Sequence, residues 1–476
     1  MTDLEDTVTR PATPPRPAAP TRSVDARVRA LTVGAVALIS LSAFEALAVA
    51  TVMPAVAADL DGLTLYAVGF GAPLATGVIG MALAGLWGDA RGPRLPLQVG
   101  VGLLCLGLLI AGVAPLMPVF VLGRAVQGLG SGMLSVSIYV LVGSVVPEPA
   151  RPRIFAYFAA AWVLPGMVGP AVAGLILHAA GWRAVFLIVP LLAVPALVLM
   201  QPALRVDRAP APDAAPDRRA AGRRTLLLAA VAGAAAAALQ VAGTRTDPLG
   251  LAVVLASAGA LGWSVPRLLP AGSFRLVRGL PAVIGVRGMV GAAFVGAEAF
   301  LPLELVRERG WSPVLAGLVL TTGTVSWSAA AWVQGRVTAL PARFRFARLG
   351  TALVAAGVLV SLASVLPPVP AALTIAGWAV TGAGMGLVYS SLSLLSLHLT
   401  PVERHGEASA ALQTSESRAS ALALALAGAD FALALPAGIG PHAAAGPVPY
   451  LAGMSVALLA GVVAALGSWR LNPAAS

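Results

Sequence analysis

The sequence contains no lysine, and all 31 of its strongly basic residues are arginine. A P-loop needs a lysine to contact nucleotide phosphates, so the sequence excludes one and argues against a chain powered by its own nucleotide hydrolysis. The single cysteine, Cys105, excludes an internal disulfide and a thiolate metal cluster, and we expect it to be a small buried hydrophobe. The four histidines lie far apart without ligand spacing. We therefore expect no metal site and no cofactor.

Charged residues are scarce as well. They make up 11% of the 476 residues, against about a quarter in soluble domains, while 58% of the residues are hydrophobic. This composition predicts an all-α integral membrane protein. The net charge of +11 does not indicate a nucleic-acid partner, because the arginines gather in short segments between apolar runs. A membrane enzyme is disfavoured, because no nucleophile and base pair is recognisable.

Apolar runs of about 17 to 25 residues predict membrane-spanning helices. We place 14 of them, at 31–54, 66–87, 95–115, 118–142, 154–177, 183–201, 225–243, 249–267, 281–303, 313–333, 347–366, 371–397, 407–433 and 449–469. The alanine-rich run 225–243 is the weakest of these, and a chain of 12 spans is the alternative.

The arginines predict how the chain is oriented. With the N-terminus inside the cell, 24 arginines lie in cytoplasmic segments, four face outside and three remain within spans. This positive-inside bias predicts that both termini are cytoplasmic, and we expect the chain to lie in the inner, or plasma, membrane.

Composition also divides the chain into segments. Residues 1–30 combine proline and arginine without the apolar stretch of a signal peptide, which predicts a disordered cytoplasmic tail. The segment 205–224 is rich in Arg, Asp, Pro and Ala and predicts a flexible cytoplasmic linker. It separates a six-helix bundle at 31–204 from two inserted helices at 225–268 and a second six-helix bundle at 281–470.

A short charged turn joins the second and third predicted spans. The stretch from Gly85 to Leu97 resembles the signature loop between helices 2 and 3 of the major facilitator superfamily. The resemblance implies that this turn gates the conformational change, with Asp89 holding the cytoplasmic ends of the two bundles together. The matching positions are Gly85, Gly88, Asp89, Gly92 and Arg94.

Polar residues within the spans of the first bundle predict a transport site. Glu45 lies near the bilayer midplane, where a carboxylate costs about 3 kcal/mol, and we expect it to exchange a proton when water or a cation arrives. Its spacing from Pro54 resembles helix 1 of the 14-span drug:proton antiporter branch, whose aspartate is here a glutamate. The alternative is a protonated acid that is functionally silent.

Helix-like spacings of three and four residues place a polar stripe on the fourth span. Its arginine belongs to a stretch that resembles the superfamily's helix 4 motif, where the arginine is implicated in proton coupling; a simple ion pair or a snorkelling arginine is the alternative. We expect the stripe to line the substrate cavity. Its members are Arg124, Gln127, Ser131, Ser135 and Tyr139.

The second bundle offers further candidates. We expect Glu298 to be a second proton or cation site; about 16 Å of helical rise separates it from Arg287 and prevents a direct pair. Gln413 and Glu416 are expected to line a cavity wall. Arg418 is expected to reach the cytoplasmic interface, and Glu304 to be a solvated charge.

The fifth predicted span contains Gly169, Pro170 and Gly174 and resembles the antiporter motif of drug exporters. A proline within a helix removes a hydrogen bond, so we expect a kink where the outer half opens and seals.

Together these patterns predict a major facilitator fold and a proton-coupled antiporter that exports amphipathic, cationic small molecules. The expected partners are a small-molecule substrate, protons and the lipid bilayer, with the protein acting as a monomer. The alternatives are a dedicated exporter of a lipid, siderophore or self-made antibiotic, and a non-transporting membrane receptor or scaffold.

Overall fold

The computed structural model describes residues 22–147, 150–204, 216–242, 247–268, 271–337, 339–401, 405–436, 438–440 and 443–472. The described part is helical throughout, with thirteen α-helices and two short 3-10 helices. The α-helices are α1 (Arg22–Asp59), α2 (Tyr66–Arg91), α3 (Arg94–Gly112), α4 (Met117–Val145), α5 (Arg151–Leu204), α6 (Pro216–Ala242), α7 (Pro248–Leu268), α8 (Leu280–Arg307), α9 (Pro313–Gly335), α10 (Leu340–Ala363), α11 (Leu373–His398), α12 (His405–Ala434) and α13 (Pro447–Gly467). The 3-10 helices are η1 (Leu63–Leu65) and η4 (Ser468–Arg470).

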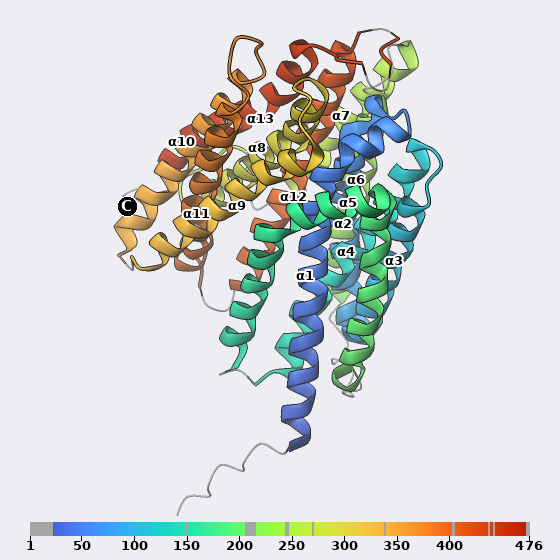
Figure 1. Ribbon diagram of the computed structural model, residues 1–476. Helices are drawn as coiled ribbons and strands as arrows, with labels where there is room; N and C mark the ends of the chain where they lie inside the picture. Colours follow the sequence, from blue (N-terminus) through green and yellow to red (C-terminus); the bar gives the residue numbers. More distant parts are fainter. Residues whose placement is uncertain are drawn as a thin grey trace, which may run out of the picture.

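The helices form two groups and a connecting pair (Figure 1). Helices α1 to α5 pack against one another, and helices α8 to α13 do the same. Helices α6 and α7 pack together, and α6 also contacts α2 of the first group and α12 of the second. The pair therefore lies beside the line along which α2 and α12 meet.

Eleven of the described helices are long and apolar enough to cross a bilayer. The apolar parts of α6 and α7, Leu226–Leu239 and Pro248–Ser264, are shorter. Each of the 14 predicted spans overlaps a described helix, but the count of 14 is not established, because two predicted spans fall within α5 and two on the shorter pair. The chain is a multi-pass membrane protein.

Helix α5 changes direction at one residue. It contains 54 residues, which would extend about 80 Å if straight, far more than the roughly 30 Å of a bilayer core. Gly181 interrupts it with a φ of 78°, in the left-handed region that glycine adopts without steric cost. The arms 151–180 and 182–204 coincide with the predicted spans 154–177 and 183–201.

Two segments predicted to be irregular are partly helical. Helix α1 begins at Arg22, within the predicted tail, and α6 begins at Pro216, within the predicted linker. Proline suits the first turn of a helix, and the acid, arginines and alanines that follow Pro216 favour helix formation. Residues 1–21 and 205–215 lie outside the described residues.

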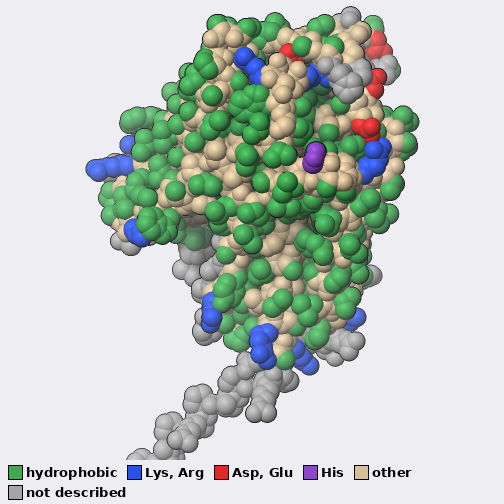
Figure 2. Space-filling view, in the orientation of Figure 1, with side chains coloured by type: hydrophobic (Ala, Val, Ile, Leu, Met, Phe, Trp, Pro, Cys, Tyr) green, Lys and Arg blue, Asp and Glu red, His purple; other side chains and the backbone are tan. Residues whose placement is uncertain are grey.

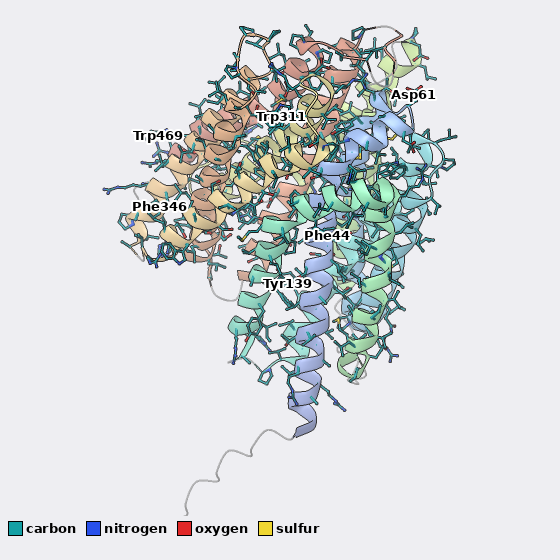
Figure 3. The ribbon with its side chains drawn as sticks, in the orientation of Figure 1. Phe44, Asp61, Tyr139, Trp311, Phe346 and Trp469 are labelled. Carbon is teal, nitrogen blue, oxygen red and sulfur yellow. The ribbon has the colours of Figure 1, made fainter. Side chains whose placement is uncertain are left out.

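The two groups meet at the end of the molecule that carries Asp61 and Trp311 (Figure 3), which we call the closed end. There the Tyr66 hydroxyl on α2 donates a hydrogen bond to the Ala299 carbonyl of α8, at 2.9 Å. Gly174 of α5 packs against Val314 of α9 at the same end. The opposite end, where α1 begins, is the open end.

The surface differs between the two ends (Figure 2). Acidic side chains on the visible face gather towards the closed end together with some arginines, while the open end displays arginines without acidic side chains beside them. The face is hollowed between the lobe formed by α9 to α11 and the lower parts of α1 and α5.

Small residues allow α2 and α4 to approach closely. A Cβ atom on Gly132 would lie 2.0 Å from the Gly77 carbonyl oxygen, and one on Gly128 would lie 2.3 Å from the Pro73 Cα. Packing of this kind drives helix association where lipid and protein are equally apolar.

We predict that Gly132→Ala lowers the free energy of unfolding by about 1–3 kcal/mol, because the added methyl forces two backbones apart. The matched control is Gly143→Ala on the same helix, where a Cβ atom meets nothing within 4 Å. The two unfolding midpoints, followed by tryptophan fluorescence in detergent, should separate clearly. Equal midpoints would contradict the packing argument.

Candidate functional site

A buried polar cluster joins α1 and α4 within the first group. The Glu45 carboxylate accepts hydrogen bonds from the Arg124 guanidinium and, at 2.6 Å, from the Gln127 amide. Arg124 also donates to the Gln127 side-chain oxygen. All three side chains are buried, with residue exposures of 6%, 4% and 2%. The structure thus brings together three residues that the sequence placed on two separate spans.

A proline in α2 leaves a backbone carbonyl free to accept a further hydrogen bond from Arg124. Pro73 has no backbone N–H, so the carbonyl of Gly69, four residues earlier on α2, lacks its usual helical partner. The Arg124 Nε donates to this carbonyl at 3.1 Å. One guanidinium therefore connects α1, α2 and α4.

The rest of the polar stripe on α4 leads away from this cluster. The Ser131 hydroxyl donates to the Gln127 carbonyl of its own helix at 3.0 Å, and Ser135 is half-buried. Tyr139 is 46% exposed, and its ring packs edge-on against Phe158. In Figure 3, Tyr139 lies nearer the open end than Phe44, the neighbour of Glu45 in sequence. The stripe therefore runs from the buried cluster towards the open end.

The second group contains an ion pair that was not predicted from the sequence. Arg287 on α8 contacts Glu416 on α12 at 2.8 Å. The Tyr389 hydroxyl of α11 donates to the same carboxylate at 3.2 Å, and Arg287 lies over the Tyr389 ring. An arginine within a membrane span requires an acidic partner on a neighbouring helix, and this requirement could have indicated the pair. Residue spacing along the sequence, however, does not show that α8 packs against α12.

Aromatic rings extend from this ion pair into the second group. Tyr389 packs against Trp327, which contacts Phe294 edge-on, and Phe294 stacks on Trp378 with ring centres 4.8 Å apart. Gln413, predicted to share a cavity wall with Glu416, is exposed.

Two expectations for charged residues were wrong. Arg418 does not reach an interface, because it is only 8% exposed. Glu304 is not solvated: it is 1% exposed and pairs with Arg309 at 2.9 Å. Close packing around both residues, which sequence spacing does not reveal, explains the difference. Glu298 is half-buried, forms no pair with Arg287, and has no ionic or hydrogen-bond partner among the described residues.

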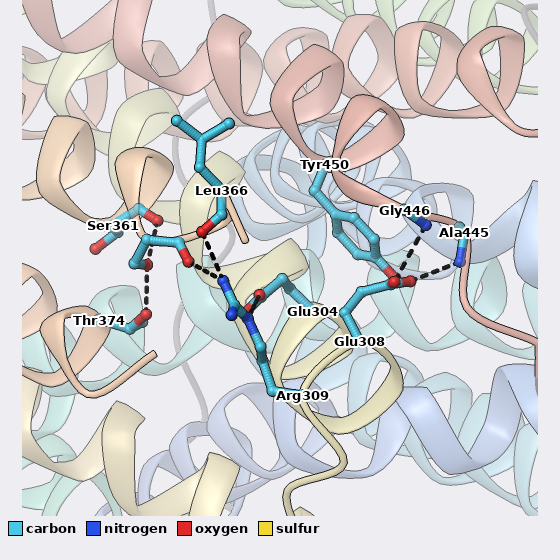
Figure 4. Close-up of polar contacts among 10 residues, drawn as sticks. Glu304, Glu308, Arg309, Ser361, Leu366, Thr374, Ala445, Gly446 and Tyr450 are labelled. Carbon is cyan, nitrogen blue, oxygen red and sulfur yellow. Dashed lines mark hydrogen bonds and ion pairs between the residues drawn. The ribbon is translucent and has the colours of Figure 1, made fainter. Parts of the chain in front are cut away.

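The pair Glu304 and Arg309 belongs to a polar cluster near the closed end (Figure 4). Arg309 also donates to the carbonyls of Ser364 and Leu366, at the end of α10. Beside it, Glu308 accepts hydrogen bonds from the Tyr450 hydroxyl and from two backbone N–H groups before α13. These contacts tie the loop after α8 to α10 and α13.

The predicted gating turn lies between α2 and α3. Gly92 has a φ of 78°, which a glycine accommodates without strain, and Arg94 is exposed. Gly85 and Gly88 have open space where a Cβ atom would stand. The Asp89 side chain lies outside the described part of the structure, so its predicted contact stays a prediction.

The glycine and proline residues of α5 lie along the surface that meets the second group. A Cβ atom on Gly174 would be 3.0 Å from a methyl carbon of Val314. The Pro170 carbonyl oxygen would be 3.0 Å from a Cβ atom on Gly317 of α9, and Gly169 lies next to Phe44 of α1. Gly174 and Pro170 therefore form part of the contact between the two groups, whereas Gly169 faces α1 within the first group.

Cys105 is buried, as expected. Among the described residues, no three His, Cys, Asp or Glu side chains are placed to hold a metal ion together.

Comparisons of the sequence with known proteins point to one family. A model of the Major Facilitator Superfamily matches residues 34–424. The drug efflux pump JefA of Mycobacterium tuberculosis is 27% identical over 288 residues, which cover 58% of this chain and 55% of JefA. An MFS-type transporter of the acurin A biosynthesis cluster of Aspergillus aculeatus is 28% identical over 274 residues, covering 56% of this chain and 45% of the relative. The chain thus spans about half the length of these two relatives.

A solved structure supports the fold. The crystal structure of a D-xylose–proton symporter matches with a TM-score of 0.62 at 17% identity, over 95% of this chain and 98% of the symporter.

We predict that Arg287→Met and Glu416→Gln each lower the free energy of unfolding by about 3 kcal/mol, because each leaves a largely buried charge without its partner. Glu416 is 24% exposed, which places the expectation at the lower end of the usual range. The double variant should cost less than the sum of the two. Equilibrium unfolding in mixed micelles measures all three.

The control for this prediction is the exposed pair of Arg183 and Asp59, whose side chains are 44% and 49% exposed. Arg183→Met should cost less than about 1 kcal/mol. Strict additivity at Arg287 and Glu416 would show that the two side chains do not stabilise one another.

Proposed function

The chain belongs to the major facilitator superfamily, and we propose that it is a proton-coupled antiporter that exports amphipathic, cationic small molecules by alternating access. The observation that carries the proposal is the carboxylate of Glu45, buried within α1 and held by Arg124 and Gln127. A carboxylate within a membrane span is costly, and such a residue usually has a role in function.

The proposed coupling step is an exchange at Glu45. While Glu45 is ionised, it pairs with Arg124, and the pair is neutral. A proton arriving on Glu45 removes the attraction and frees Arg124 and Gln127 to move. A cationic substrate entering the cavity competes for the same carboxylate and favours loss of the proton. Proton and substrate thereby alternate at one group, which is the requirement of an antiporter.

The proposed substrate cavity extends from this cluster along α4, through Ser131, Ser135 and Tyr139, and across to the second group. There Gln413 and Glu416 contribute polar groups, and aromatic rings around Tyr389 offer surface for an amphipathic cation. Glu298, which is half-buried and lacks an ionic partner among the described side chains, is the second proposed proton site.

Conformational change is assigned to the seam between the two groups. Gly169, Pro170 and Gly174 of α5 pack on α1 and α9 at the closed end, where the seam would part. We assign the opposite role to the turn containing Gly85, Gly88, Asp89, Gly92 and Arg94, which would fasten the other end in the alternate state. We propose that the proton gradient drives transport without a cofactor, because one elementary charge crossing 100 mV releases about 2.3 kcal/mol.

The proposed topology has 14 spans, with α5 counted as two and α6 and α7 inserted between six-helix bundles at 31–204 and 281–470. Arginines at the open end support a cytoplasmic location for that end and for both termini. We propose a monomer in the plasma membrane, belonging to the drug:proton antiporter branch.

A second candidate is a dedicated exporter of a lipid, siderophore or self-made antibiotic. The similarity to a transporter of a biosynthesis cluster favours it. Flux measured with a panel of unrelated cationic, neutral and anionic lipophiles separates the two: broad export of cations supports the first, and response to a single chemical class supports the second. Absence of flux under every gradient would favour a non-transporting receptor or scaffold.

We predict that Glu45→Gln abolishes substrate-induced proton release, because the amide cannot carry the exchanged proton. Everted vesicles with a fluorescent pH indicator measure the release, which should fall at least tenfold. Glu45→Asp should retain coupling, and Asp430→Asn, an exposed carboxylate on α12, should behave as the parent protein. Unchanged coupling in Glu45→Gln would remove Glu45 from the mechanism.

We predict that a disulfide between Gly174→Cys and Val314→Cys, in a Cys105→Ala background, stops transport. A Cβ atom on Gly174 would lie 3.4 Å from the Val314 Cβ, close to the roughly 3.8 Å of natural disulfides. Oxidation should abolish flux and a reductant should restore it, while each single cysteine variant stays active. Full flux through the cross-linked protein would contradict alternating access at this seam.

A further inference from the structure

A cavity of about 330 Å³ lies where the inserted helices meet both groups. Its walls come from α2, α6, α7, α8, α12 and α13, together with the loop before α8. Most of the lining is apolar, including Ala75 of α2, Ala236 of α6, Leu261 of α7 and Leu422 of α12. The cavity is separate from the Glu45 cluster, none of whose three side chains lines it.

Two polar side chains of this cavity have buried atoms without hydrogen-bond partners among the described residues. Arg418 lines it while only 8% exposed, and its Nε and Nη1 atoms have no hydrogen-bond partner within the described structure. The Ser273 hydroxyl lines the same cavity, is 1% exposed and is also unpartnered in that part of the chain. No acidic side chain is among the described residues of the lining.

A guanidinium in an apolar wall is expensive to bury unless an anion or a hydrogen-bond acceptor compensates for its lost hydration. Its planar fork of donors matches the oxygens of a carboxylate or a phosphate. The apolar remainder of the wall suits an alkyl chain. We infer that this cavity binds an amphiphile that has one anionic head group, a carboxylate or a phosphate, and an apolar tail, with Arg418 and Ser273 holding the head.

The dimensions limit the ligand. A volume of about 330 Å³ lies at the lower end of the roughly 300–1,000 Å³ of small-molecule sites, so the cavity accommodates a head group with one chain and not a whole two-chain lipid. Phe274 lines the cavity and is 70% exposed, so the cavity reaches the surface beside this residue.

Because of the position of the cavity, a bound ligand would connect helices of both groups. An amphiphile seated there contacts α2 of the first group, α12 of the second and the inserted α6 at once. Binding therefore favours the conformation in which these helices form one wall. This role is independent of proton exchange at Glu45 and of the substrate that Glu45 attracts.

The test is a thermal titration of the purified full-length protein in dodecyl maltoside with dodecanoate and, separately, dodecyl phosphate. The unfolding midpoint should rise saturably with at least one of them, and Arg418→Met should raise the half-saturating concentration at least tenfold. Arg418→Met should unfold at the same temperature as the parent or higher when no ligand is present, because it removes an unpaired charge. Dodecanol, which has the same chain and no charge, should give no saturable rise.

Three variants make the test specific. Ala236→Phe fills the cavity and keeps Arg418, so it should also lose the response; Arg418→Lys should retain part of it; and Glu45→Gln should respond as the parent does. An equal response of parent and Arg418→Met, or no saturable response to either anion, would overturn the inference.

Mass spectrometry of the protein released intact from membranes distinguishes the natural sources. Retention of an anionic phospholipid by the parent and not by Arg418→Met identifies a membrane lipid with one chain inserted. Selective retention of a fatty acid identifies a free amphiphile. Equal retention of every anionic species by both proteins would count against the site.

Discussion

The structure depends on one constraint: a charge placed inside an apolar helical bundle must find its partner within the protein, because the bilayer supplies none. In each helical group, one buried arginine meets this constraint by linking three helices. Arg124 on α4 contacts a carboxylate on α1 and a backbone carbonyl on α2. Arg287 on α8 contacts a carboxylate on α12 and a backbone carbonyl on α11. The two halves therefore share a solution that their sequences do not display as a repeated motif.

The two arginines nevertheless sit in different surroundings. Arg124 is enclosed by amide and carboxylate groups, and the carbonyl that it contacts is available because Pro73 has no N–H to offer it. Arg287 lies against the face of Tyr389, beside a series of aromatic rings. The first setting is a network of hydrogen bonds among polar side chains, whereas the second combines an ion pair with the face of an aromatic ring.

Much of the fold followed from the sequence, because hydrophobic length is a direct physical requirement of the bilayer. Predicted spans and described helices overlap throughout, and the stripe of Arg124 and Gln127 was predicted from helical spacing alone. The predictions that failed concern features that depend on contacts between helices distant in sequence. The partner of Arg287 and the burial of Glu304 and Arg418 each depend on which helices become neighbours. The starts of α1 and α6 were misplaced, because charged residues that suit a flexible segment also form helices readily.

The inserted helices cover the protein unevenly. Helix α6 lies over the line where α2 meets α12, while no inserted helix is placed, within the described chain, over the line where α5 meets α9. On the lipid-facing surface, the boundary between the two groups is therefore covered by an inserted helix on one side and uncovered on the other. This one-sided cover makes the molecule asymmetric within the plane of the membrane in a way that two equivalent bundles alone would not be.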